Sequence, residues 1–267
     1  LNPASLTSFN QQLLSAIRTK PFVLLAGISG TGKSRIVREL AKACWPDDEE
    51  QRNAQEPKNF MMIQVRPNWH DSTELIGYVS RINGEKYIAG DFIKFVARAW
   101  QDPGRPYFLC LDEMNLAPVE QYFAEYLSII ESRKLKNGKI VTDAIIRPDY
   151  KSVDGEKIVK EYYDNLIKEL IVECPDDKKH ALYIQFKTDG ISIPQNLIVI
   201  GTVNMDETTY SFSRKVLDRA MTLEMNEVDM WGGLVDDESF NFGNLEDILA
   251  NAVSDEKVAY QQDKDLC

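Results

Sequence analysis

Residues 27–34 read GISGTGKS, and this segment constrains the fold of the chain more than any other. It matches the pattern G-x-x-x-x-G-K-[ST] and stands between an apolar run at 21–26 and an amphipathic run at 34–44. A glycine-rich loop that joins a strand to a helix turns its backbone amides toward a phosphate. An ordinary glycine-rich turn is the alternative, but it would not explain the strand before the loop and the helix after it. The sequence therefore predicts a nucleoside triphosphate site.

The residue types in this loop suit that ligand. Lys33 is expected to reach the terminal phosphates as a point charge, and the Ser34 hydroxyl is expected to ligate Mg²⁺. The other predicted nucleotide-binding residues are Gly27, Ser29, Gly30, Thr31, Gly32 and Arg35.

Length and composition indicate an ordinary globular protein. The chain has 267 residues, 43% of them hydrophobic, which suits one large α/β domain or one domain plus the start of another. No apolar run approaches the roughly 20 residues that span a bilayer, so no membrane segment is expected.

The amino end lacks an initiator methionine, and we expect a fragment of a longer protein. Widely spaced cysteines and few histidines indicate a reducing cytoplasm, with Mg²⁺ as the expected metal.

The net charge of −11 is concentrated at the carboxyl end. From Glu224 onward, acidic residues far outnumber the two bases, Lys257 and Lys264, so the preceding residues are close to neutral. Non-specific binding to a duplex depends on neutralising phosphates, and such a surface is poorly suited to it. If DNA is the target, we expect another domain or subunit to hold it.

Apolar runs separated by helical segments predict a doubly wound, mostly parallel α/β sheet of five strands. A helix is expected at 5–19, ahead of the first strand. The runs that we assign to strands lie at 22–26, 60–65, 107–111, 197–203 and 221–225.

Residues typical of helix starts, between the predicted strands, indicate two more helices. Asp91 is expected to cap one of them, and Pro118 to stand in the first turn of the other. The second carries an aromatic stripe that is expected to pack in the core.

Two insertions are expected in the sheet. Asn83-Gly84, flanked by strand-like residues from 78 to 88, predicts a two-residue hairpin. The insertion at 133–190 is predicted to hold a helix near 156–173, a charged turn at 175–179 and a strand at 181–186. This insertion is expected either to contact a substrate or partner, or to be a solvent-exposed addition to the core without such a role. The sequence leaves both alternatives open.

The domain organisation follows from where the alternating pattern weakens. We expect a nucleotide-binding core at 1–225, and an acidic linker with a partial helical lid at 226–267. Within the second part, a short helix is predicted at 244–253.

Two carboxylates follow the third predicted strand. Asp112 is expected to hold Mg²⁺ and Glu113 to polarise the attacking water, because the carboxyl ends of parallel strands share the edge where the phosphate loop lies. A capping pair on the next helix is the alternative. Asn204 ends another strand and is expected to reach the same edge, although an asparagine there is often a turn residue.

Residues 213–219 place three cations before the last strand. A guanidinium supplied across a subunit boundary would stabilise charge that develops on the phosphates. A solvated helix face, with Asp218 as an ionic partner, is the alternative for this segment.

The segments GISGTGKS, FLCLDEMN, LIVIGTVNMDETT and SRKVLDRA, in this order and spacing, resemble an AAA+ ATPase of the dynein-related and MoxR-like branch, and within it the McrB-type motor. The resemblance covers about residues 5–225. It implies that Lys33 and Ser34 belong to Walker A, that Asp112 and Glu113 belong to Walker B, and that Asn204 is sensor 1. It also implies that Arg219 is the arginine finger, with Arg214 as a competing candidate. Members of this kind form hexameric rings, and McrB-type motors hydrolyse GTP and drive a separate McrC nuclease subunit.

These residues suggest four candidate functions. The leading one is a ring-forming nucleoside triphosphatase, acting on ATP or GTP, that powers remodelling or translocation for a DNA restriction or defence system. A MoxR-like chaperone acting on a protein substrate is the nearest alternative. A nuclease centred on Asp149 and on Asp176-Asp177-Lys178 would need its second element on a strand. A scaffold that binds nucleotide without turnover would have no use for Glu113 and Arg219.

Overall fold

The computed structural model describes residues 3–136, 139–153, 155–205 and 210–225. These residues cluster in two compact units. The first combines the chain up to Pro67 with Arg105–Ala117 and the residues from Ile198 on, and the second combines Asn68–Gly104 with Pro118–Leu197. The predicted lid and its helix at 244–253 lie outside the described residues, and the limits of the predicted domains stay a prediction.

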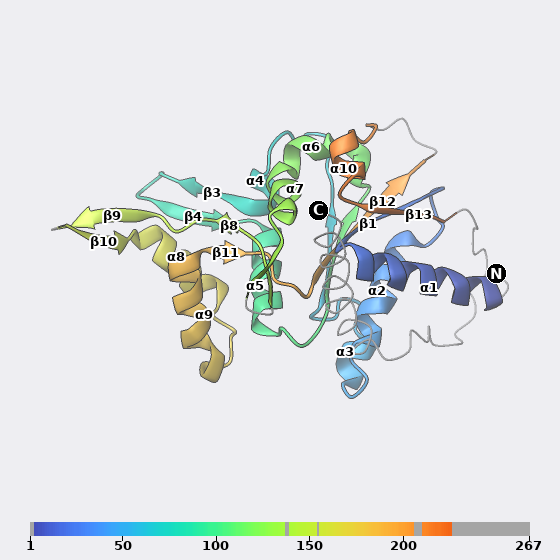
Figure 1. The fold of residues 1–267 in the computed structure, drawn as a ribbon, viewed down its shortest axis with the longest axis horizontal. Helices are drawn as coiled ribbons and strands as arrows, with labels where there is room; N and C mark the ends of the chain where they lie inside the picture. The colour runs from blue at the N-terminus through green and yellow to red at the C-terminus, as the bar shows by residue number, and fades with distance from the viewer. Residues whose placement is uncertain (1–2, 137–138, 154, 206–209, 226–267) are drawn as a thin grey trace, which may run out of the picture. The chain divides into compact units, whose positions relative to one another are not determined.

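The first unit is built on a five-stranded sheet (Figure 1). The strand order is β13-β1-β12-β5-β2, and the pairs β1–β12, β1–β13 and β2–β5 are parallel. The mostly parallel α/β sheet predicted from the sequence is therefore confirmed, with its five strands at the expected places. The elements of this unit are α1 (Pro3–Thr19), β1 (Phe22–Gly27), α2 (Lys33–Ala43), α3 (Glu49–Asn53), β2 (Phe60–Gln64), β5 (Tyr107–Asp112), η1 (Met114–Leu116), β12 (Leu197–Asn204), α10 (Arg214–Leu217) and β13 (Met221–Met225).

One face of this sheet is covered by α1, which packs on β13 and β1, and by α2, which packs on β5, β1 and β2 (Figure 1). Leu13 and Ile17 of α1 and Leu40 of α2 join Val23 and Leu25 of β1 in a single buried cluster. All eight residues of β12 are buried, as expected for an inner strand of a parallel sheet. This packing holds the carboxyl ends of β1, β5 and β12 in fixed register.

The second unit carries the helices and hairpins between β2 and β12. In Figure 1 the hairpins β3–β4 and β9–β10 extend in the same direction. Its elements are α4 (Thr73–Ile76), β3 (Gly77–Ser80), β4 (Lys86–Ala89), α5 (Asp91–Gln101), α6 (Val119–Tyr122), α7 (Ala124–Glu131), β6 (Lys134–Lys136), β7 (Lys139–Val141), β8 (Ala144–Ile146), β9 (Tyr150–Val153), β10 (Glu156–Val159), α8 (Glu161–Leu170), α9 (Asp176–Asp189) and β11 (Ile191–Ser192).

The strand predicted at 181–186 is wrong, because these residues belong to α9. Alternating apolar residues indicated a strand, yet Ile184 is 43% exposed while Leu182 and Phe186, four residues apart, are buried. The charged turn predicted at 175–179 is also wrong. Pro175 caps α9 and the acidic residues form its first turn, where negative charge is favourable.

The helix predicted near 156–173 begins later than expected. Residues 156–159 form β10, which pairs antiparallel with β9, and α8 starts only at Glu161. The turn before β10 contains Gly155 at φ +85°, a backbone conformation that favours glycine.

The helix boundaries near 91 and 118 also differ from those predicted. Gly90, not Asp91, occupies the cap position of α5. The helix after Pro118 is divided at Phe123 into α6 and α7. Its aromatic stripe packs in the core as predicted, with Phe123 and Tyr126 stacked at 4.4 Å between ring centroids.

The hairpin predicted around Asn83-Gly84 is present as β3–β4, with Tyr78 opposite Ile88. Its ladder ends at the pair Ser80 and Lys86, so the connection spans residues 81–85 and is longer than the two residues expected. No described helix is long and apolar enough to cross a membrane.

Candidate nucleotide site

The loop between β1 and α2 is shaped by two glycines and one lysine. Gly30 and Gly32 both have φ +80°, in the left-handed region that side chains disfavour. Lys33 is buried, and its Nζ donates to the carbonyl of Gly27 at 3.0 Å and to that of Ile28 at 2.7 Å. The ammonium group is therefore held inside the curve of the loop, where a polyanion would meet both it and the loop amides.

The loop is joined to the end of β5 by a direct hydrogen bond. The Ser34 hydroxyl donates to Asp112 Oδ1 at 2.7 Å, although the two residues are 78 positions apart in sequence. The Thr202 hydroxyl donates to the same oxygen at 2.8 Å. One carboxylate oxygen of Asp112 thus receives hydroxyl groups from α2 and from β12.

Glu113 follows directly and has an unusual backbone. Its φ of 53° and ψ of 49° place it in the left-handed region, which a residue with a side chain occupies only when its surroundings hold it there. Its N–H donates to Thr202 Oγ1 at 2.9 Å, and its Oε1 accepts from Asn204 Nδ2 at 3.2 Å. Both ends of Glu113 are therefore tied to β12.

These groups line a single cavity of about 290 Å³. The alternatives, a capping pair for Asp112 and Glu113 and a turn residue for Asn204, fit less well than the predicted places at this edge, because all three residues line the cavity. Gly27 does not line it and contributes its carbonyl to Lys33 instead. The lining residues are Ser29, Gly30, Thr31, Gly32, Lys33, Ser34, Arg35, Asp112, Glu113, Thr202 and Asn204.

The surroundings of the carboxylates keep one buried group neutral. Cys110 lies two residues before Asp112 on β5 and is fully buried. Burial, and to a smaller extent the negative charge of Asp112, raises the pKa of the Cys110 thiol. This cysteine is therefore a packing residue beneath the site. The cysteines among the described residues, Cys44, Cys110 and Cys174, are all buried free thiols.

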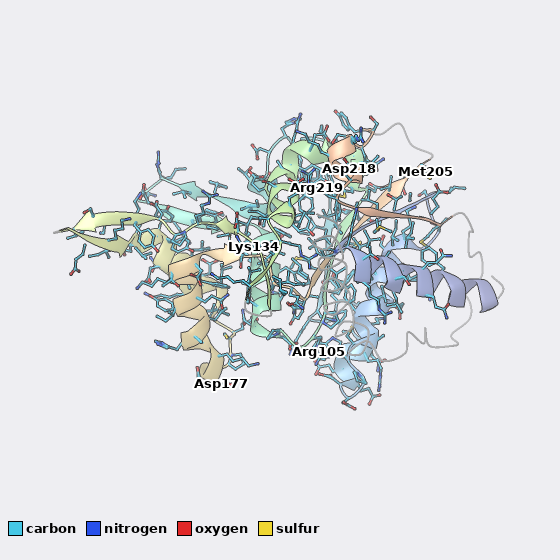
Figure 2. The ribbon with its side chains drawn as sticks, in the orientation of Figure 1. Arg105, Lys134, Asp177, Met205, Asp218 and Arg219 are labelled. Atoms are coloured by element: carbon cyan, nitrogen blue, oxygen red, sulfur yellow. The ribbon has the colours of Figure 1, made fainter. Side chains whose placement is uncertain are left out.

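Arg219 stands between α10 and β13, outside the residues that line the cavity. Its guanidinium donates to the Lys215 carbonyl, and it lies beside Asp218 as Figure 2 shows. Lys20 Nζ donates to the carbonyl of Asp218 at 2.7 Å and to that of Ala220 at 3.3 Å. The backbone on both sides of Arg219 is thereby tied to the turn before β1.

The competing arginine has a different environment. Arg214 Nε lies 3.7 Å from Asp218 Oδ2, and the Arg214 side chain is 93% exposed. The partnership with Asp218 predicted for this helix face is therefore present, and it involves Arg214.

Comparison with known proteins agrees with this geometry. Residues 22–148 match the AAA domain family of the dynein-related subfamily. The chain is also similar to the EcoKMcrB subunit of the type IV methyl-directed restriction enzyme of Escherichia coli (strain K12), at 24% identity over 124 residues. The chain carries an AAA domain and is similar to McrB. The similar segment covers 46% of this chain and 26% of the relative, so the chain spans about a quarter of that protein's length.

The donor set of this AAA+ site fits a magnesium ion. Mg²⁺ prefers hard oxygen ligands, and in nucleotide sites it takes one or two from the protein and others from phosphate and water. The Ser34 hydroxyl and the Asp112 carboxylate are such ligands, and their oxygens are 2.7 Å apart. A phosphate chain in the same cavity would be met by Lys33 and by the loop amides.

One residue of the candidate site was not predicted from the sequence. Thr202 lines the cavity and contacts both carboxyl-bearing residues, but a threonine in an apolar strand resembles an ordinary β-branched core residue. A usable signal was its position two residues before Asn204. Alternate residues of a strand point to the same face, so Thr202 shares the face that carries the predicted Asn204 amide.

Proposed function

We propose that this AAA+ protein is a nucleoside triphosphatase that assembles into a ring, expected to be a hexamer, and hydrolyses ATP or GTP with Mg²⁺. The observation that carries the proposal is the bond from Ser34 Oγ to Asp112 Oδ1, at the rim of a cavity that Lys33 and Glu113 also line. This arrangement supports a phosphate-binding role for the loop, a metal-holding role for Ser34 with Asp112, and a role for Glu113 in orienting the attacking water.

The proposed division of labour follows the positions of the side chains. Lys33 would bind the terminal phosphates, and Ser34 with Asp112 would hold Mg²⁺, which neutralises charge on the phosphates when bound. Glu113 would orient a water molecule and accept its proton. Asn204 would keep the Glu113 carboxylate directed into the cavity, as its 3.2 Å hydrogen bond to Oε1 suggests.

Arg219 is proposed to act on the site of a neighbouring subunit. It does not line the cavity of its own chain, and its backbone is fastened by Lys20. A guanidinium added at a phosphoryl-transfer site is worth roughly 10³- to 10⁵-fold in turnover. Assembly would therefore be required for full activity.

The biological role proposed is that of a motor for a DNA restriction or defence system in the cytoplasm. The similarity to a subunit of a methyl-directed restriction enzyme supports this role. A nuclease subunit like McrC is the proposed partner. DNA would be contacted indirectly, or through protein regions outside this chain.

A chaperone acting on a protein substrate is the second candidate. The hairpin β3–β4 favours it, because Tyr78 is 52% exposed and Ile82 is 83% exposed. Exposed apolar side chains on a projecting hairpin are suited to contact with a polypeptide.

The decisive experiment compares turnover of ATP and GTP by the wild-type chain and by Glu113→Gln, with the assembly state measured in each nucleotide. Removal of a general base is expected to lower turnover about 100-fold or more while nucleotide affinity is kept. Wild-type phosphate release by Glu113→Gln would contradict the proposed mechanism.

The motor and chaperone proposals are separated in the same assay by the added substrate. Stimulation of turnover by DNA and a nuclease subunit supports the restriction motor, whereas stimulation by an unfolded polypeptide alone supports the chaperone.

A further inference from the structure

Thr202 contacts both carboxyl-bearing residues of the candidate site. It lies near the carboxyl end of the buried strand β12 and is 1% exposed. Its hydroxyl donates to Asp112 Oδ1 at 2.8 Å and accepts from the Glu113 N–H at 2.9 Å. A hydroxyl group in such a strand has few partners, and this one is directed at the two residues expected to act on the metal and on the water.

The two hydrogen bonds orient each other. A hydroxyl has a single proton and two lone pairs, so when it donates to a carboxylate it can still accept from an amide. The Asp112 oxygen fixes where the Thr202 proton lies, and this leaves a lone pair directed toward the Glu113 N–H. Both bonds are lost together when the hydroxyl is removed.

The backbone of Glu113 explains why such a bond matters. At φ 53° this residue occupies a conformation that costs free energy for any residue with a Cβ. A conformation of this kind persists only where neighbouring contacts fix it. Without the acceptor on Thr202, the peptide before Glu113 is free to rotate toward the right-handed region, which would turn the carboxylate away from the cavity.

We infer that Thr202 is a positioning residue for both carboxylates: its hydroxyl holds Asp112 Oδ1 in place and keeps Glu113 in its left-handed conformation. This inference rests on the proposed function, because it assigns Thr202 a purpose in the same site. Thr202 itself would touch neither the phosphates nor the attacking water.

The test uses Thr202→Val, which keeps the shape of the side chain but removes the hydroxyl, and Thr202→Ser, which restores it. Thr222→Val on β13, a strand of the same sheet that is separated from β12 by β1, is the matched control, because Thr222 is exposed. Thr202→Val loses a hydrogen bond to a charged group, so its turnover is expected to be roughly 10- to 100-fold lower than that of wild type. The Mg²⁺ concentration for half-maximal turnover is expected to rise, while nucleotide affinity without metal stays within about twofold. Thr202→Ser is expected to recover most of the activity.

A second measurement does not depend on turnover. Hydrogen exchange followed by mass spectrometry reports on the Glu113 amide in the nucleotide-free protein. Exchange in peptides that contain Glu113 is expected to be faster in Thr202→Val than in wild type, and unchanged in Thr202→Ser and Thr222→Val. Thermal unfolding of each variant verifies that the comparison is made on folded protein, and a general loss of stability would speed exchange throughout β5.

The outcomes separate this inference from the proposed function. If Glu113→Gln hydrolyses nucleotide as wild type does, the proposed mechanism fails and Thr202 has no reaction to serve. If Glu113→Gln is inactive while Thr202→Val keeps wild-type turnover, magnesium dependence and exchange at Glu113, the positioning role is overturned. If Thr202→Ser is as impaired as Thr202→Val, the hydroxyl is not the group that matters and the inference also fails.

Discussion

Ser34 Oγ and Asp112 Oδ1 are joined by a 2.7 Å hydrogen bond that links the first turn of α2 to the last residue of β5. Both atoms are hard oxygen donors, and both line the same cavity as Lys33. The bond sets the distance between the two groups expected to hold magnesium before any ligand arrives.

Ser34→Ala removes one of these two oxygen donors. We expect the Mg²⁺ concentration for half-maximal turnover to rise about tenfold, because one protein ligand is lost while the Asp112 carboxylate remains. Ser34→Thr keeps the hydroxyl and is expected to behave as wild type. A magnesium titration of phosphate release measures both, and an unchanged titration for Ser34→Ala would remove this residue from the metal site.

Lys33→Ala removes the buried ammonium group from the loop. Hydrogen bonds to charged groups contribute about 1.5–3 kcal/mol each, so nucleotide affinity is expected to fall roughly 10- to 100-fold. Lys42→Ala is the control on the same helix, because Lys42 pairs with Glu39 at 3.1 Å outside the cavity. A fluorescent-nucleotide titration compares the two, and equal affinities would exclude Lys33 from phosphate binding.

Arg219→Ala is expected to lose most of its turnover, roughly 10³-fold or more, while nucleotide binding is kept. In mixtures with Glu113→Gln, activity should partly return. The Arg219→Ala subunit has an intact carboxylate, and a Glu113→Gln neighbour supplies the missing guanidinium. Phosphate release as a function of mixing ratio measures the effect. Arg214→Ala is the control, because the Arg214 side chain is 93% exposed. If Arg214→Ala, and not Arg219→Ala, is the variant that Glu113→Gln complements, Arg214 is the arginine finger.

Asp149 provides a pH-dependent contribution to stability in the second unit. Hydrogen bonds from Tyr162, and next from Lys160 at 2.9 Å, hold the pKa of Asp149 below its usual range. A lowered pKa in the folded state stabilises the protein above the unfolded pKa of about 3.9, and this contribution is lost as pH falls through the folded pKa. Asp149→Asn is therefore expected to unfold more easily than wild type at pH about 7, with the difference shrinking below pH about 4.

Thermal unfolding at both pH values measures this contribution. Asp47→Asn, at an exposed position between α2 and α3, serves as the control. A difference between wild type and Asp149→Asn that persists unchanged in acid would show that the charge of Asp149 is not its source.

Local sequence determined the elements whose signals are short and strong. The loop at 27–34 and the strands at 22–26, 107–111 and 197–203 could be placed from glycine spacing and apolar runs alone. Parallel strands end at one sheet edge, so the arrival of Asp112, Glu113 and Asn204 at one cavity also followed from their positions in the chain.

The spacing of apolar residues gave a wrong prediction where the same residues fitted both a strand and a helix. Leu182, Ile184 and Phe186 alternate as a strand would, yet only the outer two are buried, because α9 presents residues four positions apart to its unit. The sequence predicted a helix where β10 lies, because the pairing of β10 with β9 is a contact between strands that no local pattern records.

Sequence by itself determined that this chain has a phosphate-binding loop followed by a strand ending in two carboxylates, because both are local patterns set by residue type and spacing. Only the tertiary structure decided that Thr202 reaches both Asp112 and Glu113, and that Glu113 adopts a left-handed backbone. Those contacts join residues about 90 positions apart, across adjacent strands of the sheet. Their distances depend on how the strands are packed and registered, which the order of residues along the chain does not state.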